Sequence, residues 1–205
     1  MQSLDPPAPN RRGTLARPGA LGAGSAWLYA TSVAAKTAAT TERDAETILR
    51  GGACVLMLRH AQTEAGIGEP PDFNLAQCST QRNLSEAGRA QSRQIGQWLE
   101  SRRLRPRQVA SSSWCRCKET AELAFGRHTV LPALASTFDD SSMQAGQTQA
   151  LRALVATTPA GQFDVWVTQQ VNITALTGEG PPMGEAVIVG GTGKALPQTC
   201  QGRQG

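Results

Sequence analysis

The sequence predicts an α/β protein with a mostly parallel central sheet and helices on both faces. The segment ACVLML, residues 53–58, is a run of six apolar residues without alternation, as expected of a strand covered on both sides. Short apolar segments of this kind then alternate along the chain with segments of helical spacing, the order typical of a parallel sheet. The length of 205 residues is sufficient for one domain with a sizeable core.

Each element follows from local sequence. TERDAETILRGG predicts a short helix ahead of the first strand. The next helix begins after Ser85, a good N-cap, and has an apolar stripe formed by Leu84, Ala87, Ile95, Trp98 and Leu99. RQVASSS predicts a strand, CKETAELAFG a helix ending at Gly126, and TVLPAL another strand. QTQALRALVAT predicts a helix, FDVWVT a strand, QQVNITALTG a loop or helix, and GEAVIVG the last strand.

Composition limits the class of partner. Lys and Arg number 20 against 16 Asp and Glu, for a net charge of +4. The basic residues are scattered and not interleaved with aromatic residues, so we expect no nucleic-acid partner. A local pocket of arginines for a small anionic substrate is compatible with these totals.

The five cysteines are Cys54, Cys78, Cys115, Cys117 and Cys200. The CRC spacing does not suit a zinc finger or ribbon, and two histidines add few ligands, so we predict no metal site. Cys54 opens the apolar run and is predicted to be a core residue. A disulfide from Cys78 to either Cys115 or Cys117 would form if the chain leaves the cytoplasm.

The first fifty residues differ from the rest. Arg11 and Arg12 precede a mildly apolar stretch, Gly19 to Ala35, and small residues follow in SVAAKTAA. This order predicts a twin-arginine export signal over residues 1–35 and a periplasmic or secreted protein. The alternative is a disordered extension rich in Ala, Gly and Pro, in which case the protein is cytoplasmic. The stretch is too short and polar for us to expect stable membrane insertion.

The remaining boundaries divide the chain into a leader segment at 36–50, a main folded domain at 51–192 and a tail at 193–205. Near the end of the domain, VGGTGKA resembles a P-loop only superficially, because Lys194 is followed by Ala195 instead of Ser or Thr. We predict a surface turn there.

Three predicted strands end in polar residues: LMLRHAQT, VASSSWCRC and VWVTQQVN. The carboxyl ends of parallel strands meet at one edge of a sheet, where ligands collect. Arginine forks match phosphate oxygens, and a neutral imidazole can attack phosphorus in line. We therefore predict a phosphoryl site with His60 as nucleophile, at an edge that gathers Arg59, His60, Thr63, Ser111, Ser112, Arg116, Thr168 and Gln169.

Several motifs in the same order resemble those of the histidine phosphatase superfamily, related to phosphoglycerate mutases and bacterial phosphohistidine phosphatases. They are LRHAQTE, STQRNLSEAGRAQS, SSSWCRCKETA, VTQQVNITALTG and GEAVIVG, over roughly residues 50 to 190. The resemblance implies a three-layer α/β sandwich like that of phosphoglycerate mutase. It also implies a phosphohistidine intermediate on His60, with Arg59 and Arg116 binding the phosphoryl group and Thr63 close by.

The resemblance implies no metal or organic cofactor, and a small phosphorylated substrate or a phosphohistidine protein as partner. We include Ser112 and Gln169 among the substrate-binding residues. Gln169 stands where the family has its second histidine, and an amide carries no charge. The chain is therefore either a weakened phosphatase or an impaired pseudophosphatase that binds phosphate or a partner.

The general acid is expected in STFDDSS, after TVLPAL. Asp139, with Asp140 beside it, is the nearest acidic candidate for protonating the leaving group. The alternative is that this pair is a solvated part of a loop.

Overall fold

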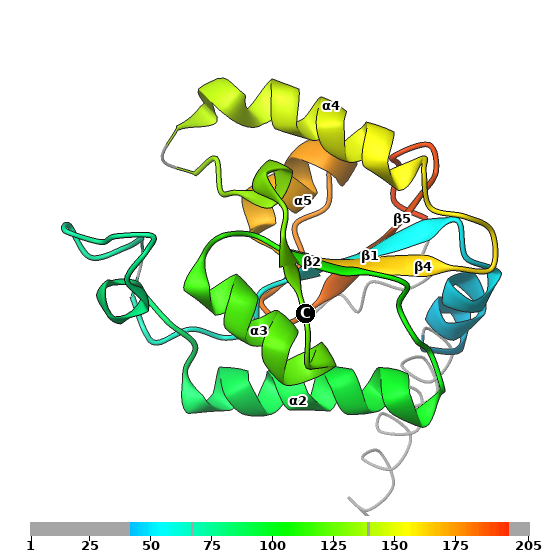
Figure 1. Cartoon of the computed structure of the whole chain (residues 1–205), viewed down its shortest axis with the longest axis horizontal. Helices are drawn as coiled ribbons and strands as arrows, with labels where there is room; N and C mark the ends of the chain where they lie inside the picture. The colour runs from blue at the N-terminus through cyan, green and yellow to red at the C-terminus, as the bar shows by residue number, and fades with distance from the viewer. Residues whose placement is uncertain (1–41, 67, 139, 197–205) are drawn as a thin grey trace, which may run out of the picture. The chain divides into compact units, whose positions relative to one another are not determined.

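The protein is described by a computed structural model that covers residues 42–66, 68–138 and 140–196 (Figure 1). These residues contain one five-stranded sheet with the strand order β3-β2-β4-β1-β5. The strands are β1 (Cys54–Arg59), β2 (Val109–Ser111), β3 (Thr129–Val130), β4 (Phe163–Thr168) and β5 (Ala186–Gly190).

The sheet is parallel except at one edge. Strand β1 pairs in parallel with β4, so that Arg59 lies opposite Thr168, and β4 and β3 pair in parallel with β2. Strand β5 alone is antiparallel, pairing with β1. The carboxyl end of β1 therefore lies beside the amino end of β5, and the segment that enters β5 lies at the same edge as Arg59.

Helices cover both faces of this sheet. Figure 1 shows α2 (Glu86–Ser101) and α3 (Cys115–Phe125) below it, with α4 (Gln144–Val155) and α5 (Gln170–Thr177) above. Residues 42–51 are also helical, and three short 3-10 turns are η1 (Cys78–Thr80), η2 (Pro132–Leu134) and η3 (Ser141–Met143). The predicted three-layer α/β fold is confirmed.

The apolar run that predicted β1 has a simple structural cause. Cys54, Leu56 and Leu58 belong to a core cluster shared with α2 and α3. Val55 and Met57 belong to a second cluster, shared with α4 and α5. Because successive strand residues point to opposite faces, a strand between two helical layers must be apolar at every position.

Local signals set most helix ends. The side chain of Ser85 accepts a hydrogen bond from Gly88 N at the start of α2. Gly126 and Gly178 end α3 and α5 in the left-handed conformation, at φ 65° and 83°. The prediction that TVLPAL is a strand was wrong beyond Val130, because residues 132–134 form η2 instead. Pro132 cannot donate to a strand ladder, and it suits the first position of a helical turn.

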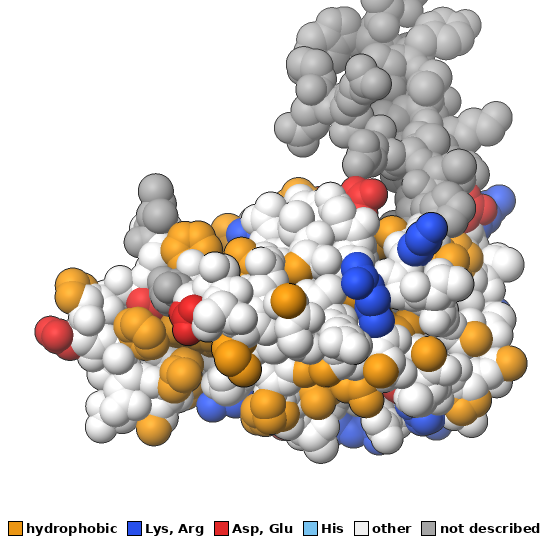
Figure 2. Space-filling model, turned by 90° about the horizontal axis from the view of Figure 1, so that it is seen from above, with side chains coloured by type: hydrophobic (Ala, Val, Ile, Leu, Met, Phe, Trp, Pro, Cys, Tyr) orange, Lys and Arg blue, Asp and Glu red, His pale blue; other side chains and the backbone are white. Residues whose placement is uncertain are grey.

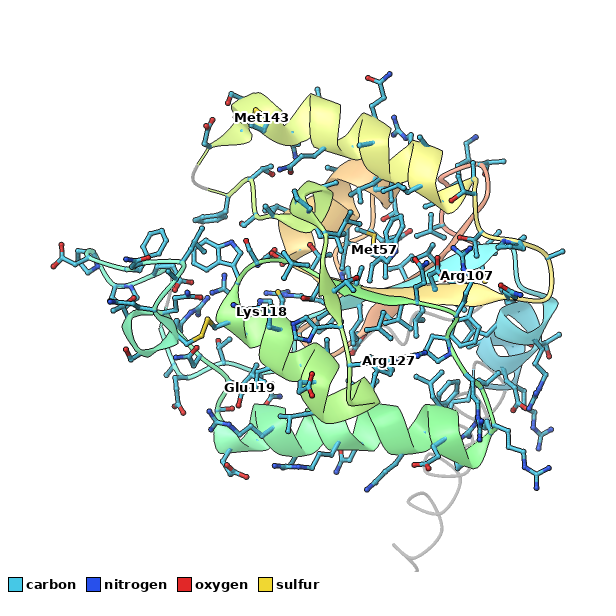
Figure 3. All side chains as sticks on the ribbon, viewed as in Figure 1. Met57, Arg107, Lys118, Glu119, Arg127 and Met143 are labelled. Atoms are coloured by element: carbon cyan, nitrogen blue, oxygen red, sulfur yellow. A yellow bond between two sulfur atoms is a disulfide. The ribbon has the colours of Figure 1, made fainter. Side chains whose placement is uncertain are left out.

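A disulfide joins Cys78 to Cys115, which settles the alternative left by the sequence, while Cys117 is a buried free thiol. In Figure 3 the disulfide appears as a yellow bond beside α3. Within the described ranges no helix has the length and apolar character needed to cross a membrane. The predicted export signal and Cys200 lie outside the described residues, as does most of the predicted tail.

Candidate active site

The end of β1 delivers two neighbouring side chains to one edge of the sheet. His60 follows directly after the strand, and its N–H donates to Thr168 O of β4 at 3.0 Å. Gly184 N, just before β5, donates to His60 O at 3.0 Å. The residue after β1 is thus held on both sides, by the end of β4 and by the segment that enters β5.

A pocket of about 350 Å³ opens at this edge. That volume is at the low end of the range for small-molecule sites. The pocket is lined by Arg59, His60, Gly66, Gly68, Glu69, Arg82, Trp114, Arg116, Ser136, Phe138, Gln169, Gln170, Val171 and Met183.

The His60 ring is buried and neutral. Its Nδ1 lies 2.9 Å from Ala61 O, and because a carbonyl can only accept, Nδ1 carries the proton and Nε2 keeps its lone pair. Burial is the main cause that lowers the pKa of His60 to about 3, against the Ala61 hydrogen bond, which raises it. Repulsion from Arg116, Arg59 and Arg82 lowers this pKa further. The site thus holds a neutral imidazole of defined tautomer, the state that a nucleophile requires.

Three arginines make the pocket electropositive. Arg59 donates to Gln170 Oε1 at 2.7 Å and to Pro181 O at 3.0 Å, and Arg116 lies over the Trp114 ring. Burial, followed by repulsion from Arg82 and Arg116, lowers the pKa of Arg59. Within the described part of the chain, the buried Nε atoms of all three arginines have no hydrogen-bond partner. A phosphoryl group is the kind of ligand that such donors bind.

Glu69 and Arg82 complete the charged lining, and sequence reasoning singled out neither. Glu69 Oε1 pairs with Arg116 Nη1 at 2.5 Å, and both side chains are buried. Glu69 Oε2 accepts from Arg82 N at 2.8 Å. Glu69 thus ties the segment between β1 and α2 to α3. Arg82 could have been found from the sequence, because it lies inside the motif STQRNLSEAGRAQS. Glu69 lies in a Gly- and Pro-rich loop that carries no sequence signal for a pocket residue.

Gln169 is the buried N-cap residue of α5 and lines the pocket. Its Nε2 donates to Cys117 Sγ at 3.3 Å, and its Oε1 accepts from Thr168 Oγ1 at 3.4 Å. Burial raises the pKa of Cys117 to about 12, so this sulfur is a neutral thiol. One of the two amide N–H groups of Gln169 remains for a phosphoryl oxygen, without a charge to assist it.

The other predicted residues are placed differently. Thr63 does not line the pocket, and its hydroxyl donates to Met183 Sδ at 3.9 Å. Ser112 is fully buried and is not a lining residue either. Asp140 caps η3 by accepting from Ser142 N at 2.9 Å, which lowers the pKa of its carboxyl. Asp139 lies outside the described residues, next to Phe138 of the lining. No cluster of three or more metal-binding side chains occurs in the described part of the chain.

Comparison with known families decides the assignment. Residues 55–181 match the family described as histidine phosphatase superfamily, branch 1. The chain belongs to this superfamily. The expected resemblance is thereby confirmed, and the match runs from β1 to the segment before β5. No protein in the curated set matches the chain.

Several solved structures are similar to this chain at low identity. The protein histidine phosphatase SixA in complex with tungstate is 18% identical, with a TM-score of 0.48, over 70% of this chain and 92% of that one. The protein TTHB049 from Thermus thermophilus is 18% identical, with a TM-score of 0.48, over 70% and 97%. A mycobacterial glucosyl-3-phosphoglycerate phosphatase is 19% identical, with a TM-score of 0.43, over 61% and 77%.

Of the residues expected from the resemblance to the histidine phosphatase superfamily, Arg59, His60, Arg116 and Gln169 line one pocket. They come from the ends of β1 and β4 and from the first turn of α3. The roles of these residues stay predictions, and so do those of Thr63, Ser112 and Asp139.

Proposed function

We propose that this chain hydrolyses a phosphomonoester or phosphohistidine through a phosphohistidine intermediate on His60. The observation that carries the proposal is the neutral His60 ring in a pocket with Arg59, Arg82 and Arg116. The three guanidinium groups would hold the equatorial oxygens and stabilise the charge of the transferring group. The hydrogen bond from Nδ1 to Ala61 O would fix the ring and stabilise the imidazolium-like state formed on attack.

In the first step, the Nε2 lone pair of His60 attacks phosphorus and forms an N–P bond. The bond from phosphorus to the leaving oxygen, or to the leaving nitrogen of phosphohistidine, breaks with its electron pair. The leaving atom takes up a proton, for which we propose Asp139 as donor. In the second step, water attacks the same phosphorus and gives its proton to the Asp139 carboxylate. The N–P bond breaks, its electron pair returns to Nε2, and inorganic phosphate leaves.

The proposed rate is low because of Gln169. Replacing a charged imidazole with a neutral amide removes one charge-assisted contact to the phosphoryl group. That loss would cost about 2–4 kcal/mol of transition-state stabilisation, or roughly 10²–10³ in rate. Gln169→His is expected to raise kcat by that factor, measured with a chromogenic aryl phosphate.

A second candidate function is a pseudophosphatase that binds phosphate or a phosphorylated partner without turnover. The engagement of the Gln169 amide with the Cys117 thiol favours it. In this case the native chain and His60→Ala would show equal background rates, and Gln169→His would create activity. No gain in Gln169→His would contradict this explanation of the defect.

The test of the main proposal is direct labelling. The protein is mixed with a phosphate ester carrying labelled phosphorus and quenched in alkaline denaturant, because the N–P bond is acid-labile. We expect label on a peptide that contains His60, and none in His60→Ala. The variant His128→Ala is the matched control, since that histidine lies outside the pocket. Label that persists in His60→Ala would refute the proposed nucleophile.

We also propose export through a twin-arginine signal that precedes the described residues. The Cys78–Cys115 disulfide supports it, since such bonds persist outside reducing compartments. Replacing both Arg11 and Arg12 with Lys is expected to retain the full-length chain in the cytoplasm. N-terminal sequencing of the exported product checks the cleavage site, and a product with its N-terminus intact would contradict the proposal.

A further inference from the structure

Part of the pocket lining is hydrophobic. Phe138, Val171 and Met183 line the pocket from three separate segments, and we call them the apolar wall. Phe138 is 67% exposed. A large apolar side chain left in water beside a ligand pocket is a feature of surfaces that bind apolar groups.

A second exposed apolar side chain follows Phe138 closely in the sequence. Met143 lies at the start of α4 (Figure 3), five residues after Phe138, and is 62% exposed. Figure 2 views the molecule from the α4 side and shows several groups of hydrophobic side chains on that surface.

Apart from the arginines, several polar lining side chains already use part of their hydrogen-bonding capacity inside the protein. Gln170 Oε1 accepts from Arg59, and Gln169 Nε2 donates to Cys117. Ser136 Oγ accepts from Phe138 N at 3.3 Å. Part of the polar capacity of the lining is therefore already used, and burying an unpaired hydroxyl group of a ligand is costly.

The charge of the pocket matches a single phosphate. Three arginines and one carboxylate, Glu69, line it, and His60 is neutral, so their sum is +2. A phosphate monoester carries a charge of about −1.5 to −2 at neutral pH. Among the described residues, no further arginine lines the pocket to bind a second phosphate or a carboxylate on the substrate.

We infer, on the basis of the proposed function, that the substrates are small phosphomonoesters whose organic group is uncharged and apolar. The phosphoryl group lies among the arginines and the organic group against the apolar wall. A planar aromatic ring suits this wall well, because it can stack on the Phe138 ring and contact the Met183 thioether. Sugar phosphates and bisphosphates would bind more weakly.

The test uses two phosphonates that differ only in the apolar group and cannot be hydrolysed. Binding of benzylphosphonate and methylphosphonate to the full chain is measured by titration calorimetry at a mildly alkaline pH. We expect benzylphosphonate to bind about 10-fold more tightly, which is roughly 1.4 kcal/mol. Phe138→Ala is expected to remove most of this preference. Leu154→Ala, an exposed apolar residue outside the pocket, is the matched control and should keep the preference.

Equal affinities for the two phosphonates would overturn the inference, and so would a preference that survives Phe138→Ala. Inorganic phosphate in the same titrations separates the inference from the proposed function. If phosphate binds and His60 becomes labelled while the phosphonates bind equally, only the apolar substrate class fails. If neither phosphate nor the phosphonates bind, the phosphoryl pocket fails and the inference fails with it.

Discussion

At the scale of single residues, the neutral state of His60 has a consequence for folding. Burial holds its pKa near 3, whereas an unfolded histidine titrates near its ordinary value of 6.5. Between these values the unfolded chain binds a proton that the folded chain does not, so His60 makes stability fall as the pH falls. Above pH 6.5 the imidazole is neutral in both the folded and the unfolded chain, so His60 no longer makes the free energy of unfolding depend on pH.

We therefore expect the free energy of unfolding to fall more steeply with acidification in the native chain than in His60→Asn. The difference between the two should reach about 3 kcal/mol from pH 7 to pH 4. Urea titrations at several pH values measure it. Parallel pH curves for the two proteins would contradict a buried neutral histidine.

Glu69 is the second residue with a distinct prediction. Its carboxylate is the buried partner of Arg116, so Glu69→Gln leaves that guanidinium without its counter-charge. Removing one partner of a buried pair typically costs about 3–5 kcal/mol. Arg116 would at the same time be free for an anion, so inorganic phosphate should bind about 10-fold more tightly to this variant.

Thermal unfolding with and without phosphate measures both effects, because a ligand that binds only the folded state stabilises it. The matched control is Glu119→Gln. Glu119, labelled in Figure 3, pairs with Arg89 at 2.6 Å, but both side chains are about one third exposed. An exposed pair of this kind contributes at most about 1 kcal/mol. Equal losses of folding stability in Glu69→Gln and Glu119→Gln would contradict a buried ion pair between Glu69 and Arg116.

At the scale of elements, α2 depends on a glycine that lets it approach the active-site segment. A Cβ added to Gly88 would lie 1.9 Å from Gln62 O, a backbone atom two residues after His60. Gly88→Ala should therefore displace the segment that follows His60 and destabilise the fold by more than about 2 kcal/mol.

Gly146 in α4 is the control, because nothing lies within 4 Å of a Cβ added there. Gly146→Ala should stabilise the helix by about 0.5–1 kcal/mol, since alanine has the higher helix propensity. Circular dichroism during urea unfolding compares the two variants. An unchanged free energy of unfolding in Gly88→Ala would contradict the close approach of α2 to the backbone at Gln62.

The elements also show why some predictions held and others did not. Strand β1 and the start of α2 have strong local causes, an unbroken apolar run and a Ser cap, and were predicted correctly. Pro132 ended a predicted strand early, since a missing N–H outweighs an apolar pattern. The reversed direction of β5 could not be predicted, because residues 184–190 carry no signal of strand direction.

At the scale of the whole molecule, the Cys78–Cys115 disulfide changes the balance between folded and unfolded chains. The bond closes a loop with a sequence separation of 37, and this loop includes Arg82 of the pocket. Constraining the unfolded chain in this way stabilises the fold by about 2–4 kcal/mol.

A reductant should lower the free energy of unfolding of the native chain by about 2–4 kcal/mol, seen as a lower urea midpoint. It should also weaken phosphate binding, because the segment around Arg82 loses a covalent anchor. A double variant, Cys78→Ala with Cys115→Ala, should start at the lower midpoint and not respond to the reductant. An unchanged midpoint in the reduced native chain would show that the disulfide does not constrain the fold.

The whole molecule also explains how far the site could be predicted. His60 and its arginine neighbours follow from strand ends that gather at one edge, so chain order alone brought Arg59, His60, Arg116 and Gln169 together. Glu69 enters the pocket through a loop whose path depends on long-range contacts, and no periodicity encodes it. The position of Thr63 also depends on long-range contacts. Its hydroxyl contacts Met183, and the side chain does not line the pocket.

The stacking of Arg116 on Trp114 provides an optical signal. The guanidinium lies 4.6 Å from the ring centroid, and the indole lines the pocket. An anion that draws Arg116 toward itself would alter the surroundings of that indole, and its ultraviolet emission would shift on occupancy. Association could then be followed without any chemical turnover, and a protein that binds its ligand but never cleaves it would still be detected.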